Sequence, residues 1–270
     1  MNTKTLSITI NDELISYNDD QINVVIPPYV RRICAGSISC SNAISLFIPK
    51  YVFQIDDLSL STLNKLQTIT VHPENKHFKV INNCLVETST KKLIISAKGG
   101  TVPNDDSVNI ISAYAFKNRN DLTQITIPDT IKSIGQNAFE GCKNLKKVVL
   151  PKHLQTIKEN TFYKCTKLTN VKFPTTLKEI GSNVFNKCTN LKCVVIPKTT
   201  GQIGEGAFNC ANLETVCLPT GVKNIHEKTF DFSAPITIYG RSDTFAEHYA
   251  KSQKINFVVT SSYKKFDVAA

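Results

Sequence analysis

Apolar and polar positions recur with a period of 22 to 23 residues from about residue 111 to residue 230. The unit is clearest in IGQNAFEGCKNLKKVVLP at 134–151, which superposes on IKENTFYKCTKLTNVKFP and IGSNVFNKCTNLKCVVIP further along the chain. Four residue columns keep this period over five units, which chance does not produce, so the chain contains an internal repeat. The columns are Phe116, Phe139, Phe162, Phe185, Phe208 and Phe230; Cys142, Cys165, Cys188 and Cys210; Leu122, Leu145, Leu168, Leu191 and Leu213; and Pro128, Pro151, Pro174, Pro197 and Pro219.

Each unit ends in Leu-x-x-(Ile/Val)-x-(Ile/Leu/Phe)-Pro, and this alternation followed by proline predicts one short strand that stops at the proline. A single unit cannot bury both its strand residues and its Phe, so the units must stack on one another. The pattern therefore predicts a mainly β, right-handed solenoid with a parallel sheet on its concave face.

The rest of the chain fits one solenoid domain over 1–260. We expect an N-terminal cap at 1–30, degenerate repeats at 31–110, regular repeats at 111–235, a C-terminal cap at 236–260 and a tail at 261–270. The segment near 76–100 predicts an inserted hairpin, with strands at 78–81, 84–87 and 92–96. The C-terminal cap reads as strand, helix and strand, with Ser242 as the N-cap of a helix that ends near Lys251.

Composition adds one electrostatic feature. Residues 140–198 hold twelve lysines against three glutamates, whereas the flanking regions are nearly neutral. Clustered positive charge attracts anionic partners, so weak binding to anionic polymers is one expectation. The lysines occupy many different columns and the chain has only four Arg, so we predict a solvated surface and no specific nucleic-acid site. The N-terminus lacks the apolar run of a secretory signal, and no stretch has the length of a membrane span.

The nine cysteines are unlike a disulfide framework, and we expect thiols in a reducing compartment. The four cysteines of the repeat column form a line, whereas zinc needs four ligands that converge on a point, so we predict a structural, buried role and no metal or other cofactor. Cys193 and Cys217 fall between inward-facing positions, which predicts that both face solvent, either as reactive thiols or as residues without a functional role.

The sequence motifs do not favour an enzyme. The five histidines form no HExxH arrangement, and neither G-x-S-x-G nor a P-loop occurs. Binding is instead expected on the concave sheet, because curvature of a solenoid produces an extended surface there. The outward positions of its strands are Gln124, Thr126, Lys147, Val149, Asn170, Lys172, Cys193, Val195, Thr215 and Cys217. This mixture of small polar, aliphatic and lysine side chains suits a protein partner, although it contains no aromatic anchor.

The repeat motif IGxNAFxxCxxLxxVxLP, seen at 134–151, resembles the BspA-like class of leucine-rich repeat, and the likeness covers about residues 20–260. Arg119 departs from the motif in the Cys column, as do Lys158 and His226 at the Gly position. The resemblance implies a leucine-rich-repeat solenoid and a surface protein that binds host or matrix proteins. An intracellular scaffold or regulatory interaction module is the alternative.

Overall fold

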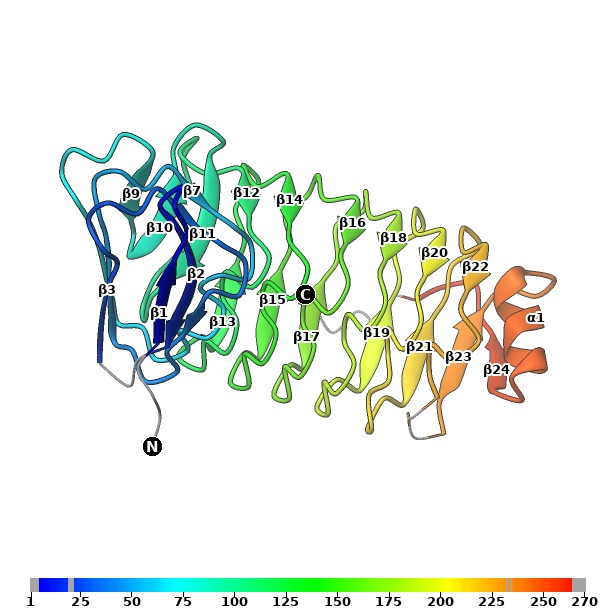
Figure 1. Cartoon of the computed structure of the whole chain (residues 1–270). Helices are drawn as coiled ribbons and strands as arrows, with labels where there is room; N and C mark the ends of the chain where they lie inside the picture. Colours follow the sequence, from blue (N-terminus) through cyan, green and yellow to red (C-terminus); the bar gives the residue numbers. More distant parts are fainter. Residues whose placement is uncertain (1–4, 19–21, 232, 234, 264–270) are drawn as a thin grey trace.

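The computed structural model describes residues 5–18, 22–231, 233 and 235–263. The repeats form the turns of an elongated solenoid, and the turns lie side by side from the N-terminal to the C-terminal end (Figure 1). This arrangement confirms the predicted parallel solenoid.

One row of strands is formed by the strand that precedes the proline in each unit, and we call it the long-strand row. In the regular repeats it consists of β13 (Gln124–Thr126), β15 (Lys147–Val149) and β17 (Asn170–Lys172), followed by β19 (Cys193–Val195) and β21 (Thr215–Cys217). In the N-terminal half it consists of β3 (Asn23–Val25), β6 (Ser45–Ile48) and β8 (Thr68–Val71). Neighbouring strands within β3-β6-β8, β13-β15-β17 and β19-β21 pair in parallel.

A second row of two-residue strands, the short-strand row, was not predicted. Each of its strands ends at the Ile before the Gly position of the unit. They are β4 (Arg32–Ile33), β7 (Gln54–Ile55), β12 (Ile110–Ile111), β14 (Ser133–Ile134), β16 (Thr156–Ile157), β18 (Glu179–Ile180), β20 (Gln202–Ile203) and β22 (Asn224–Ile225). Neighbours within β4-β7, β12-β14 and β16-β18-β20-β22 pair in parallel. A two-residue strand has one inward side chain and hence no alternation, so periodicity in the sequence does not reveal it.

Turns between the two rows repeat as regularly as the strands do. After each long strand of the regular repeats, the proline carbonyl accepts the N–H three residues later, as from Leu154 to Pro151 at 3.1 Å. Two residues in each of the first four regular units have left-handed backbone, for example Asn137 and Gly141, whereas the fifth unit has one, Gly206. Their N–H groups donate to the next unit along the chain, so each turn is tied to its neighbour. Lys164 and Lys187 occupy the same column as Gly141 and have φ of 61° and 64°, which is costly for a residue with a Cβ.

The Gly position allows consecutive turns to approach closely. A Cβ built on Gly135 would lie 2.2 Å from the backbone nitrogen of Ala113 in the preceding unit. At Gly181 the corresponding approach is 3.0 Å, to the nitrogen of Glu159. Close packing of turns is therefore strictest at Gly135 and looser beside Lys158, which already carries a side chain in this column.

The core of the regular repeats is a stack of phenylalanines. The six rings of the Phe column lie 5.0 to 6.0 Å apart between consecutive centroids and within 17° of parallel. Each buried thiol of the Cys column donates from Sγ to the Phe carbonyl of the preceding unit, at 3.1 to 3.2 Å. These contacts agree with the buried structural role predicted for both columns.

The inserted hairpin is confirmed as β9 (Phe78–Ile81), β10 (Cys84–Glu87) and β11 (Lys92–Ser96), and it separates two hydrophobic cores. Alternate side chains of a strand point to opposite faces. Cys84 and Val86 accordingly join the core of the regular repeats, whereas Leu85 joins the N-terminal core. The hairpin is therefore a wall that is buried on both sides, and β11 continues the short-strand row by pairing in parallel with β12.

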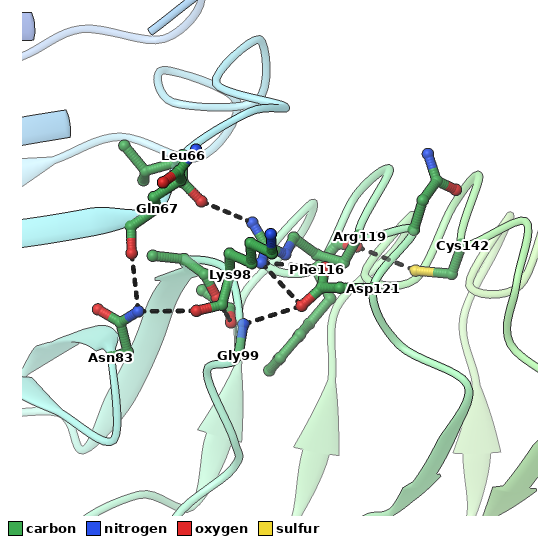
Figure 2. Close-up of polar contacts among 12 residues, drawn as sticks. Leu66, Gln67, Asn83, Lys98, Gly99, Phe116, Arg119, Asp121 and Cys142 are labelled. Carbon is green, nitrogen blue, oxygen red and sulfur yellow. Dashed lines mark hydrogen bonds and ion pairs between the residues drawn. The ribbon is translucent and has the colours of Figure 1, made fainter. Parts of the chain in front are cut away.

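A polar cluster crosses this wall, as Figure 2 shows. Arg119 is buried, and its guanidinium donates to the Leu66 carbonyl at 2.9 Å and to Asp121 at 3.1 Å. Asp121 also accepts the Gly99 N–H at 2.8 Å. Each Cys of this column donates a hydrogen bond to a carbonyl of the preceding unit. Arg119 also donates to an earlier unit, through a longer side chain, because the hairpin lies between that unit and its own. We call this contact of Arg119 with Leu66 and Asp121 the brace between the two halves of the chain.

The N-terminal end is an antiparallel pair, β1 (Thr5–Ile8) and β2 (Glu13–Asn18), and β2 also pairs in parallel with β4 and β5 (Ile38–Ser39). The C-terminal end is the predicted β-α-β unit: β23 (Thr237–Gly240), α1 (Phe245–Ser252) and β24 (Asn256–Val259). Tyr249 of α1 packs edge-on against Phe230 and closes the Phe stack. The prediction of Ser242 as the N-cap is wrong, because the helix begins after Thr244.

Candidate functional site

The side chains that point away from the core on the long-strand row form one surface, which we call the outer face. The first and third residues of each strand supply it, because the middle residue points inward. Register keeps the two sets apart: Gln124, Lys147 and Asn170 align in one column. The second column is Thr126, Val149 and Lys172. Adjacent strands lie about 4.8 Å apart, so each column is a continuous line of side chains.

Exposure along the outer face falls toward the C-terminal end. Gln124, Thr126, Lys147 and Lys172 are exposed, and the next strands carry half-buried side chains. The half-buried members are Val149, Asn170, Cys193, Val195 and Thr215. Nine of the ten predicted outward residues thus lie together on this face and are accessible to a partner.

Cys217 is the exception, and its predicted solvent exposure is wrong. The residue is fully buried, although it holds the outward position of β21. The chain turns back after β24, and the Tyr263 hydroxyl donates to the Leu218 carbonyl at 2.7 Å. Burial there raises the pKa of Tyr263, and the thiol of Cys217 is close enough to add to the effect. A contact from 46 residues further along the chain is invisible to strand periodicity.

Aromatic side chains, which the repeat pattern did not predict as exposed, are accessible in the N-terminal half. Tyr29 and Tyr51 each lie two residues after the proline of an Ile-Pro pair, on consecutive turns, and Phe53 lies beside them in sequence. Between 45% and 55% of each side chain is exposed. The ammonium of Lys50 lies 5.4 Å from the ring centroid of Tyr51. The Ile-Pro pairs at 26–27 and 48–49 mark the ends of two strands, and they could have predicted that Tyr29 and Tyr51 lie at equivalent places in consecutive turns.

Lysines surround the outer face without forming a single stripe. Lys146 directly precedes β15, Lys147 lies on it, and Lys172 lies on β17. Other lysines of the 140–198 segment lie elsewhere: Lys178 directly precedes β18 of the short-strand row, and Lys164 lies over the Tyr163 ring in a turn. The structure therefore spreads the positive charge over several sides of the solenoid.

The thiol column has no nucleophilic character. Burial raises the pKa of Cys142 and Cys210 to about 12, and it raises those of Cys165 and Cys188 well above the ordinary range. A thiolate is the reactive form, so these groups are inert at neutral pH. Among the described residues, no three His, Cys, Asp or Glu side chains gather where a metal ion could be held.

The stacked units and the parallel strand rows define the class of protein: a leucine-rich-repeat solenoid. The chain belongs to the family with the BspA type leucine-rich repeat region, whose model matches residues 2–105 and 109–237 in six copies. No curated protein matches the chain. No helix among the described residues has the length and apolar character needed to cross a membrane.

Three solved structures share the fold at low sequence identity. The pneumococcal vaccine antigen PcpA is 17% identical with a TM-score of 0.71, and the match covers 89% of this chain and 68% of that one. A leucine-rich repeat protein from Bacteroides ovatus is 19% identical, with a TM-score of 0.53 and coverage of 96% and 76%. A leucine-rich cell surface protein from Faecalibacterium prausnitzii is 21% identical, with a TM-score of 0.53. That match covers 92% of this chain and 62% of the other, so this chain spans less than two thirds of that relative.

Proposed function

We propose that this chain is a non-enzymatic, surface- or adhesion-type interaction protein that binds another protein through its outer face. The observation that carries the proposal is the register of the long-strand row. It lines up accessible side chains on consecutive strands from Gln124 to Thr215. A long, shallow surface of this kind suits a protein partner better than a small molecule, because small molecules favour concave pockets.

The chemistry of the surface indicates what the partner presents. Lys146, Lys147 and Lys172 stand on or beside the outer face, which favours a partner with negative charge. Tyr29, Tyr51 and Phe53 supply aromatic anchors, and aromatic residues are enriched among the side chains that dominate binding energy. Weak binding to anionic polymers through 140–198 follows from the same charge, and it should weaken steeply as salt screens the lysines.

Adhesion is supported by resemblance. One structural neighbour is described as a vaccine antigen and another as a cell surface protein. Sequence identity to these two proteins is 17% and 21%, so a surface role for this chain is stated as a proposal.

An intracellular scaffold is the second candidate, and the thiols favour it. All nine cysteines are present as thiols, and seven of them are buried. Titration with a thiol reagent after denaturation, on protein taken directly from cells, separates the two settings. Nine reactive thiols support the scaffold, whereas disulfides point to an oxidising exterior.

Site-specific photo-cross-linking in the native cell tests the working face. A photoreactive residue at Asn170, on the outer face, should give an adduct with a specific partner. The matched control is Glu179, an exposed residue of β18 on the short-strand row. Equal adducts at both positions, or an adduct at Glu179 alone, would overturn the assignment of the face.

A further inference from the structure

Exposed large hydrophobic side chains lie in the N-terminal part of the described chain and at its C-terminal end. Apart from Tyr29, Tyr51, Phe53, Leu58 and Val80, they form one group at each end of the solenoid. Within the described residues, those at the N-terminal end are Leu6, Ile10, Ile15, Ile22 and Val25, and those at the C-terminal end are Phe245, Val258 and Val259. Between residues 81 and 244, by contrast, the described chain exposes no large hydrophobic side chain. Terminal repeats usually carry a polar outer surface, because it keeps a solenoid soluble as a monomer. Both ends of this solenoid depart from that rule.

Among the described residues, each end also has a strand of the long-strand row that is paired on one side only. β3 is the first strand of β3-β6-β8, and β24 is the last strand of β19-β21-β23-β24. Both groups belong to the long-strand row, and every pairing within them is parallel. A β3 strand placed beside β24 would therefore continue the row in the direction that the pairing already has.

Backbone groups at both edges point outward. The Ile26 N–H donates to the Phe47 carbonyl of β6, so the N–H of the preceding residue, Val25, points to the open side. At the other end the Thr260 N–H donates to the Gly240 carbonyl at 2.7 Å. The N–H of Val259 accordingly points away from β23. These donors and the carbonyls beside them can form a parallel ladder with a new strand.

Neither edge strand carries the charged residues or proline that usually protect an edge against pairing. Proteins guard edge strands with charged residues, proline or a covering element. β3 reads Asn-Val-Val and β24 reads Asn-Phe-Val-Val, without charge or proline. Val25 is 56% exposed and Val259 is 62% exposed, so pairing would also bury apolar surface.

We propose that the solenoid associates head to tail with a second copy of itself, through β24 of one copy and β3 of the next. The contact is heterologous, because different surfaces of the two copies meet, and it leaves one open edge at each end of the assembly. Addition of further copies then lengthens the row, and the outer face of each copy joins that of its neighbour. A partner with repeated sites would bind such an assembly more tightly than one copy.

Two edge variants test the proposal. Val25→Pro and Val259→Pro each remove the outward N–H, at positions where proline breaks no bond within the chain. Sedimentation velocity on the wild-type chain should show a series of multiples of its mass that shifts upward with concentration. Each variant alone should sediment as one copy, because one of the two edges that a head-to-tail contact needs is missing.

Mixing the two variants gives the decisive result. The intact C-terminal edge of Val25→Pro can meet the intact N-terminal edge of Val259→Pro, so the mixture should form dimers and nothing larger. Val80→Ser is the matched control, since it removes a 38% exposed apolar side chain on β9, away from both edges, and it should associate as the wild type does. If proline disturbs folding, as judged by thermal melting, Val25→Lys and Val259→Lys replace it with edge charges.

Three results would overturn the proposal. The first is a wild-type chain that stays a single copy at every concentration. The second is association of either blocked variant by itself, which would indicate contact between like ends. The third is a mixture that fails to form dimers although both variants are folded.

Discussion

The brace between the two cores makes the most specific prediction about stability. Substitution of Arg119→Met keeps an apolar stem of similar length and removes the guanidinium. Removing one partner of a buried ion pair costs about 3–5 kcal/mol. Here the loss is smaller, because Asp121 keeps the Gly99 N–H and the Leu66 carbonyl keeps the Lys98 N–H at 2.8 Å. Asp121 is also 25% exposed to water. We expect the free energy of unfolding to fall by about 2–3 kcal/mol.

Urea unfolding followed by far-ultraviolet circular dichroism measures this loss, since the chain has no Trp to report by fluorescence. Amide hydrogen exchange shows which strands lose stability in the variant. Protection should fall in β11 and near β13, beside the brace, while β20 and β22 keep theirs. Asp121→Asn is the matched variant, and it should cost less because its side chain still accepts hydrogen bonds.

The pH dependence gives a second readout of the same contact. Burial alone would raise the pKa of Asp121, but the Gly99 N–H and the Arg119 guanidinium outweigh it and hold the pKa below its ordinary value. A carboxyl with a lowered pKa stabilises the folded state above its unfolded pKa, and this contribution is lost as the pH falls through the folded pKa. The wild-type chain should therefore lose stability below about pH 4, and Arg119→Met should lose less. A variant within 0.5 kcal/mol of wild type, with the same pH profile, would refute the brace.

Three further predictions follow from the packing of the turns and of the C-terminal segment. Gly135→Ala should lower the free energy of unfolding by about 2–3 kcal/mol, because the added methyl group overpacks against backbone. Gly181→Ala should lower it by less than about 1 kcal/mol. Equal losses for the two variants in urea unfolding would contradict the close approach at Gly135. Lys187→Gly should raise the free energy of unfolding by about 0.5–1 kcal/mol by relieving a left-handed residue, and a lower melting temperature would count against that. Tyr263→Ala should let a maleimide reagent label Cys217 in the folded protein, and mass spectrometry that finds no label would show that another group covers this thiol.

The sequence could predict what the repeat enforces. The strands before the prolines, the Phe and Cys columns and the three strands of the hairpin all follow from alternation or from fixed spacing, and the structure contains them. The short-strand row could not be predicted, because strands such as Ser133–Ile134 are too short to show an alternation of apolar and polar residues. The division into two cores could not be predicted for a related reason. A strand that is buried on both faces is a continuous apolar run, and such a run does not show that its two faces belong to different cores.

Contacts between distant segments account for the errors at the candidate site. Cys217 is buried close to Tyr263, whose hydroxyl bonds to the adjacent Leu218 carbonyl, and nothing in the repeat encodes that return of the chain. Thr244 rather than Ser242 is the N-cap of the last helix, although both residue types serve as N-caps and the two lie two positions apart. Arg119 was recognised as a departure from the Cys column, but its partner Leu66 lies 53 residues earlier in the chain.

The central claim is that the outer face of the long-strand row binds the partner while the rest of the solenoid supports it. The most direct test measures the affinity of the partner captured by cross-linking at Asn170, for two charge-reversal variants. Lys147→Glu changes the outer face, and Lys178→Glu makes the same change beside the short-strand row. The account predicts at least a tenfold loss of affinity, about 1.4 kcal/mol, for Lys147→Glu and wild-type affinity for Lys178→Glu. Equal losses, or a loss confined to Lys178→Glu, would contradict it.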